Sequence, residues 1–150
     1  MYGRPGSPEE PGRDYVFSSP DPLWPFGHGL SYTDFEYSDL DIQTPQLDSD
    51  GMLSFQVTVK NTGSVAGKDV VQVYINDKVS SCTTPTKRLV AFEKIQLEPD
   101  KSSEVSFEVP ASELGLWNSM MEYVVEPGSF ELMVGSSSED IRIKEDFEVV

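Results

Sequence analysis

Apolar and polar residues alternate along several short segments of this chain, and the clearest of them is 52–61. Leu53, Phe55 and Val57 occupy every second position there, with serine, glutamine and threonine beside them. Successive side chains of a strand point to opposite faces, so a period of two predicts a strand with one buried face. The turn-forming sequences DSDG and NTG mark the two ends of this segment.

The same alternation recurs along the chain, and turn residues separate the segments that show it. Over 110–115 a single helical turn is expected, because Ser112 is a residue type that caps helices, and no longer helix is indicated. The pattern predicts an all-β, antiparallel two-sheet β-sandwich of immunoglobulin type with seven to eight strands. The further strands are expected at 69–76, 88–97, 102–109, 121–125, 130–134 and 141–149, with a first strand beginning near Tyr32.

Segment 88–97 changes phase partway along its length. Val90 and Phe92 share one parity, whereas Ile95 and Leu97 share the other. A β-bulge between the two pairs would return both to the core, so we expect one there.

Residues 22–35, PLWPFGHGLSYTDF, break the strand pattern. The prolines fix φ and remove backbone donors, and the glycines allow turns closed to other residues, so a helix is excluded. We expect 21–34 to form a rigid, extended connector held by its aromatic side chains, followed by the sandwich at 35–150. Residues 1–20 are rich in proline and glycine and are expected to be a disordered or extended tail from a preceding domain.

Charge and composition exclude several classes of function. The 150 residues carry a formal net charge of −15, which disfavours nucleic-acid and membrane-surface partners. The single cysteine, Cys82, and the single histidine, His28, are far apart in the sequence and supply neither a disulfide nor a zinc-type ligand set. We therefore expect no metal site and no cofactor. The first twenty residues lack the apolar run of a signal peptide, so localisation stays open.

Four blocks of sequence resemble one known family in order and spacing. These blocks are PLWPFGHGLSYT at 22–33, VKNTGSVAGKDVVQVYI at 59–75, SSCTTPTKRLVAFEKIQLE at 80–98 and YVVEPGSFELMVG at 123–135. Together they resemble the C-terminal fibronectin type III-like domain of glycoside hydrolase family 3, whose members include β-glucosidases and β-xylosidases. Trp24 and His28 stand where tyrosine is common in the family, and both replacements keep an aromatic ring.

The resemblance implies a non-catalytic accessory module within a larger enzyme. The family's parent enzymes are retaining β-glycosidases that act without a cofactor, and such a parent could be periplasmic or secreted. Their nucleophile is an aspartate in a Ser-Asp-Trp-type motif of another domain, whereas here Ser38-Asp39 and Ser49-Asp50 are followed by leucine and glycine. We therefore expect this chain alone to be inactive, with no catalytic residue.

The expected partner is the catalytic part of such an enzyme, in cis or as a separate chain. A proline-rigid connector presents its aromatic rings to whatever precedes the sandwich, and the polar loop 80–87 lies near the other domains in the family. The residues expected at this domain interface are Trp24, Phe26, Gly27, His28, Gly29, Tyr32 and Pro85.

Two alternatives remain open: an independent carbohydrate-binding module that takes β-glycans, and a protein-interaction sandwich. Exposed aromatic rings would favour the first alternative, because they stack on sugars. We expect Trp24 to pack on a neighbouring domain and Trp117 to cap the open end of the sandwich. Tyr32 and Tyr123 are expected to have structural roles in or beside strands.

Overall fold

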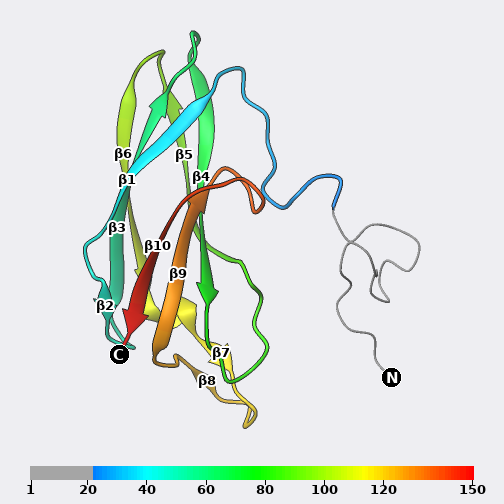
Figure 1. The fold of residues 1–150 in the computed structure, drawn as a ribbon, viewed down its shortest axis with the longest axis vertical. Coiled ribbons are helices and arrows are strands. Elements are labelled where there is room, and N and C mark those ends of the chain that lie inside the picture. Colours follow the sequence, from blue (N-terminus) through cyan, green and yellow to red (C-terminus); the bar gives the residue numbers. More distant parts are fainter. Residues whose placement is uncertain (1–21) are drawn as a thin grey trace.

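The computed structural model describes residues 22–150, and it is a β-sandwich (Figure 1). The tail expected at 1–20 lies outside the described residues. Seven long strands, which the alternation predicted, and one short edge strand make up the two layers; the strand expected at 121–125 is short and lies outside them. The elements are β1 (Phe35–Ile42), β2 (Gln46–Leu47), β3 (Met52–Asn61), β4 (Gly67–Asp77), β5 (Arg88–Leu97), β6 (Ser102–Pro110), η2 (Ala111–Leu114), β7 (Leu116–Trp117), β8 (Tyr123–Val124), β9 (Gly128–Gly135) and β10 (Ile141–Val149).

One layer is a three-stranded sheet in the order β1-β3-β6, and the other is a five-stranded sheet in the order β2-β10-β9-β4-β5. The long strands pair antiparallel throughout, and only the two-residue β2 lies parallel to β10. The third sheet is a small antiparallel ladder of β7 and β8 below the sandwich (Figure 1).

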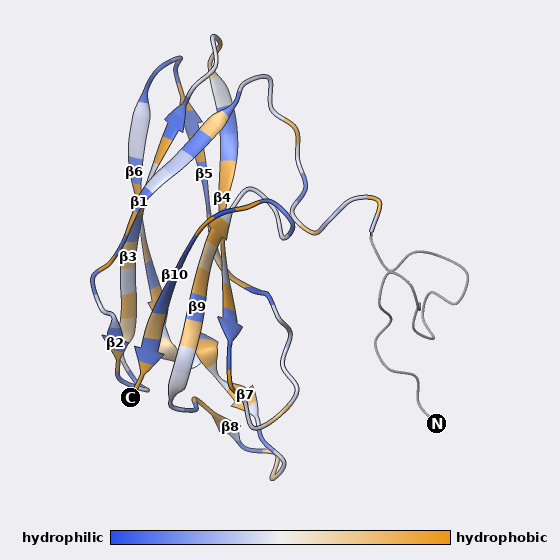
Figure 2. Cartoon of the chain, viewed as in Figure 1, coloured by the Kyte–Doolittle hydropathy of each residue, from blue (hydrophilic) through white to orange (hydrophobic). Residues whose placement is uncertain are grey.

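The inner faces of the two sheets form one apolar core, visible as alternating orange and blue segments along the strands in Figure 2. Leu53, Phe55 and Val57 of β3 are almost fully buried, whereas the residues between them are partly exposed. Phe55 stacks on Phe107 of β6 with 5.3 Å between the ring centroids. The period of two therefore placed these side chains on the correct face.

The phase change in β5 occurs at a different residue from the one expected. Ala91 lies opposite Val73 while Leu89 lies opposite Tyr74, so Val90 is the extra residue of the bulge. Val90 and Ala91 both pack against the core, and Phe92 is 67 % exposed on the outer face. The expected bulge between Phe92 and Ile95 was wrong, because the position of a bulge depends on the register of the partner strand.

Two smaller expectations also need correction. The turn over 110–115 forms as the 3-10 helix η2, but Pro110 occupies its N-cap and no side chain caps it, so Ser112 does not have that role. The first strand begins at Phe35 rather than near Tyr32, because Phe35 is the first of these residues whose side chain enters the core.

Candidate domain-docking surface

The connector, residues 22–34, runs along one side of the sandwich (Figure 1), and most of its large apolar side chains are exposed. Tyr32 is 98 % exposed, so its expected structural role in a strand was wrong. Trp24 stacks on His28 with 4.9 Å between ring centroids, and both rings lie at the surface. The exposed apolar residues of the connector are Leu23, Trp24, Phe26, Leu30 and Tyr32.

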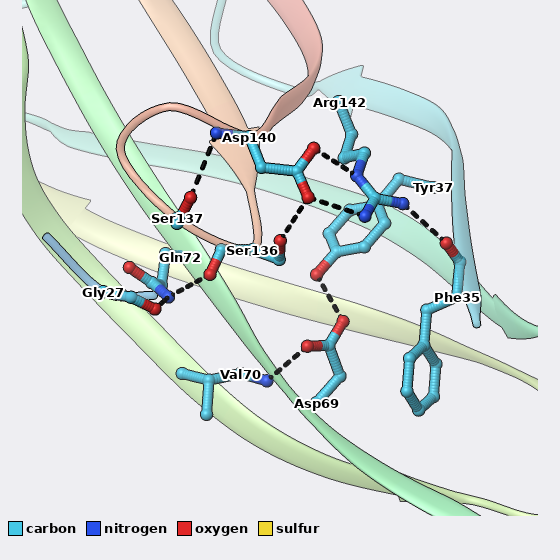
Figure 3. Close-up of polar contacts among 10 residues, drawn as sticks. All are labelled: Gly27, Phe35, Tyr37, Asp69, Val70, Gln72, Ser136, Ser137, Asp140 and Arg142. Atoms are coloured by element: carbon cyan, nitrogen blue, oxygen red, sulfur yellow. Dashed lines mark hydrogen bonds and ion pairs between the residues drawn. The ribbon is translucent and has the colours of Figure 1, made fainter. Parts of the chain in front are cut away.

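Polar contacts, rather than these apolar side chains, attach the first half of the connector to the sandwich. The Gln72 Nε2 group on β4 donates to the Gly27 carbonyl at 3.0 Å and to the Ser136 carbonyl at 2.5 Å (Figure 3). Tyr74 in turn donates to Gln72 Oε1 at 2.6 Å, which holds the amide in this orientation. The backbone N–H of Ser138 donates to the Phe26 carbonyl at 2.9 Å. We call this set of contacts the Gln72 clamp.

The Gln72 clamp requires glycine at position 27. Gly27 has φ +79°, and a Cβ there would lie 1.9 Å from Gln72 Oε1. Gly29 differs, since an added Cβ would meet no atom within 4 Å. Both glycines were expected at a domain interface, and for Gly27 the structure gives a role within the chain itself.

Replacing Gly27 with alanine should detach the first half of the connector. The added methyl group clashes with the Gln72 amide and forces a φ that alanine adopts only at a cost. In the variant, we expect the Ser138 amide to exchange with deuterium at least tenfold faster, as measured by NMR. Gly29→Ala is the matched control and should leave that exchange rate unchanged; equal acceleration in both variants would contradict the clamp.

A second set of contacts holds the end of the connector where it enters β1. Thr33 Oγ1 donates to Asn61 Oδ1 at 2.6 Å, and Ser31 Oγ donates to the Lys68 carbonyl at 3.2 Å. Asn61 is fully buried, and its amide nitrogen donates to the carbonyls of Val65 and Leu97. The connector is therefore anchored at both ends.

Between the two anchors, the connector and the sheet flank an open cavity of about 440 Å³. Its floor is the outer face of β4 and β5, including Lys68, Val70 and Lys94. The connector bridges this cavity instead of packing onto the sheet, which leaves Leu30 and Tyr32 free to contact another surface.

Beside this cavity, a cluster of partly buried polar side chains links β1 to β4 and β10 (Figure 3). Arg142 makes two hydrogen bonds of 2.7 Å to the Asp140 carboxylate and a third to the Phe35 carbonyl. Tyr37 donates to Asp69 Oδ2 at 2.8 Å, and the Arg142 guanidinium lies over the Tyr37 ring.

The electrostatics of this cluster follow from burial and from these bonds. Burial, with the Asp69 carboxylate beside it, raises the pKa of Tyr37 far above its ordinary value. Hydrogen bonds from Arg142 lower the pKa of Asp140, and the same bonds raise the pKa of Arg142. The Asp140 carboxylate is thus held ionised by internal partners, which suits a structural role. Within residues 22–150, no group of three or more His, Cys, Asp or Glu side chains could hold a metal ion.

The loop between β4 and β5, residues 78–87, extends this surface below the connector (Figure 1). Lys87 reaches the β9–β10 loop, where it donates to the Ser138 carbonyl at 2.5 Å and pairs with Glu139 at 3.1 Å. Ser81 is bonded through its backbone and side chain to the Glu126 carboxylate. Pro85 is exposed on this loop, and the link between the loop and the connector runs through Lys87 and Ser138.

The hairpin of β7 and β8 carries apolar residues that the sequence analysis did not single out. Met120 and Met121 at its tip are 73 % and 77 % exposed. Trp117 is 62 % exposed and meets Tyr123 edge to face, so its expected role as a cap of the sandwich was wrong. The sequence NSMME offered a signal, because two methionines follow a turn-forming asparagine where polar residues are usual.

The order and pairing of the strands, together with the connector, define a fibronectin type III-like β-sandwich. Residues 69–138 match the family model of the fibronectin type III-like domain. The periplasmic β-glucosidase of Salmonella typhimurium is 40 % identical over 143 residues, which cover 93 % of this chain and 19 % of that protein. A putative β-xylosidase of Formosa agariphila is 43 % identical over 130 residues, covering 87 % of this chain and 17 % of that protein.

A solved structure of a β-glucosidase gives the same match. The β-glucosidase from Listeria innocua in complex with glucose superposes with a TM-score of 0.83 at 37 % identity, covering 98 % of this chain and 21 % of that chain. This chain is a fibronectin type III-like domain similar to those of glycoside hydrolase family 3 β-glucosidases and β-xylosidases, as the resemblance in its sequence indicated. It spans about a fifth of the length of the curated relatives it matches.

Proposed function

We propose that this domain is a non-catalytic accessory module that stabilises the catalytic part of a β-glucosidase or β-xylosidase. The observation that carries the proposal is the connector, which is anchored by polar contacts while Trp24, Phe26 and Tyr32 face outward. Large exposed aromatic side chains on a fixed backbone are typical of interfaces, because little conformational freedom is lost when a partner covers them.

The length of the relatives supports a partner for this surface. Their polypeptides are about five times longer than the segment they share with this chain, so a second body of catalytic structure is available to cover the connector. In this proposal the catalytic part supplies both carboxyl groups of a retaining glycosidase. This domain stabilises the fold of the catalytic part through contacts made by the connector.

A chimera tests the proposal. This chain would replace the matching segment of the Salmonella typhimurium β-glucosidase, and the half-life of its activity on an aryl β-glucoside at raised temperature would be measured. We expect Trp24→Ala to shorten that half-life at least threefold, because an interface aromatic contributes about 2 kcal/mol when buried. Met52→Ala removes an exposed apolar side chain on the three-stranded sheet and is the matched control, which should leave the half-life unchanged.

Two further measurements complete this test. Deleting the segment altogether should abolish activity or shorten its half-life further, and the isolated chain should release no nitrophenol from aryl β-glucosides or β-xylosides. The proposal fails if the enzyme that lacks the segment keeps its activity for as long a half-life as the chimera does. It also fails if the chimera is inactive although the isolated chain is folded.

Glycan binding is a second candidate, favoured by the exposed rings of Trp117 and Tyr123. Affinity electrophoresis on cellulose, xylan and laminarin separates the two functions. An accessory module predicts no retardation on any of these glycans. Retardation that Trp117→Ala abolishes, without any change in the half-life of the chimera, would favour the sugar-binding module.

A further inference from the structure

The β7–β8 hairpin, residues 116–124, presents its apolar tip to solvent on a stiff support. Asn118 organises the turn: its Oδ1 accepts hydrogen bonds from the backbone N–H groups of Met120 and Glu122 at 2.9 and 3.0 Å. The backbone N–H of Asn118 donates to the Glu122 carbonyl, and the Asn118 carbonyl accepts from the Met121 N–H, each at 3.0 Å. The two methionines therefore stand on a turn with a defined geometry.

The backbone at the tip is strained in a way that solvent exposure does not explain. Met121 has φ +61°, a left-handed conformation in which glycine or asparagine is usual. Strained residues of this kind cluster at functional sites. A methionine in this position gives up stability of the free domain while placing a flexible, polarisable side chain at the surface.

The base of the hairpin is braced against the sandwich. Tyr123 donates to the Ser112 carbonyl at 2.8 Å, and its ring lies so close to Gly115 that a Cβ there would approach it to 2.6 Å. Arg88 of β5 donates to the carbonyls of Gly115 and Glu113. The hairpin thus moves with the five-stranded sheet as one body.

Hydrogen bonds connect the hairpin to the connector along the same side of the molecule (Figure 1). Arg88 donates to the Gly115 carbonyl at the base of the hairpin, and the neighbouring Lys87 donates to the Ser138 carbonyl. The Ser138 N–H in turn donates to the Phe26 carbonyl of the connector. The 78–87 loop lies between the two and adds the exposed side chain of Val79. A protein that covers the connector could therefore extend along the same side of the domain and also contact the hairpin.

The chemistry of the tip favours a protein surface over other occupants. A second copy of this chain would also carry a net charge of −15, which opposes self-association. A sugar platform built from both rings needs them coplanar, whereas Trp117 and Tyr123 are inclined at 61°, and the most exposed large side chains at the tip are Met120 and Met121. Methionine side chains adapt to irregular apolar pockets.

We propose that the hairpin is a second docking element, which inserts Met120 and Met121 into an apolar depression on the catalytic part of the same enzyme. This inference rests on the proposed accessory function and adds a contact remote from the connector. The connector fixes one end of the domain and the hairpin fixes the other, so the domain cannot rotate about the connector.

Methionine oxidation by hydrogen peroxide, read by mass spectrometry, tests the contact directly. In the isolated chain, Met120 and Met121 should oxidise rapidly to the sulfoxide. In the chimera described above, both should oxidise at least tenfold more slowly. Met52 and Met133 are internal controls: Met52, on the three-stranded sheet, should stay reactive in both proteins, and Met133, at 1 % exposure, should stay slow in both.

A substitution adds a test with opposite expected signs. Met121→Gly relieves the left-handed strain and removes the docking side chain. The melting temperature of the isolated chain should rise or stay unchanged, while the half-life of activity of the chimera should shorten at least threefold. A hairpin with only a structural role would shift both quantities in the same direction, and that result would overturn the inference.

The outcomes separate this inference from the proposal on which it rests. If Trp24→Ala shortens the half-life but Met120 and Met121 oxidise at their free rate in the chimera, the accessory function stands and the hairpin contact is wrong. If deleting the whole segment has no effect, both are wrong. Protection in the isolated chain that increases with protein concentration would assign the tip to self-association and overturn the inference.

Discussion

Phe55→Ala should lower the free energy of unfolding by about 3–5 kcal/mol. The Phe55 side chain is 1 % exposed at the centre of β3, and it stacks on Phe107 across the neighbouring strand. Removing the ring therefore loses both its transfer free energy and its packing contacts, and it leaves a cavity that the rigid sheets cannot close. Urea unfolding followed by tryptophan fluorescence would measure the change.

Gln56→Ala is the control for the Phe55 variant. Gln56 is the next residue along β3 and faces outward, where it accepts only a long hydrogen bond of 3.4 Å from Gln43. Its loss should cost less than about 0.5 kcal/mol. Equal costs at the two positions would contradict the burial of one face of β3.

The strands could be predicted from the sequence because their signal is local. Alternation located β3 and β10 to the residue, and turn residues marked their ends. The bulge at Val90 could not be located in this way, because it depends on which β4 residue each β5 residue opposes. The two-residue β2 was missed, since so short a parallel pairing leaves no period to detect.

The docking surface could be predicted only in part. Proline, glycine and aromatic residues identified the connector, and Trp24 and Phe26 are indeed exposed on it. The partner of Gly27 is Gln72, and the partner of Tyr37 is Asp69, each distant in the sequence. No periodicity connects such residues, so the clamp and the polar cluster required the structure. The burial of Tyr74 on the outer face of β4 could not be foreseen for the same reason.

Asn61 holds together three segments of the chain, and its replacement should be costly. Its amide nitrogen donates to the Val65 and Leu97 carbonyls at 2.8 and 3.1 Å, and its oxygen accepts from Thr33 Oγ1 and from the Gly63 N–H. All four hydrogen-bonding positions of this buried amide are therefore satisfied.

Asn61→Ala should lower the free energy of unfolding by about 3 kcal/mol, because it removes all four of these bonds and takes the amide donor from the buried Leu97 carbonyl. Thr33→Val removes one of the four bonds and keeps the shape of the side chain, so it should cost only about 1 kcal/mol. Thermal or urea unfolding at neutral pH would measure both. A Thr33→Val variant as unstable as Asn61→Ala would show that the connector contact, rather than the buried amide, dominates.

Asn61→Asp should make stability depend on pH in a defined direction. The new carboxyl group faces the carbonyls of Val65 and Leu97 in a buried site, so its pKa in the folded state is raised above the ordinary value of about 3.9. The folded state then binds the proton more tightly than the unfolded state. Relative to the original chain, the variant should be least destabilised below about pH 4, and its deficit should grow as the pH rises through the raised pKa. A deficit independent of pH between 3 and 8, in parallel unfolding curves of the two proteins, would contradict the orientation of the Asn61 amide toward those two carbonyls.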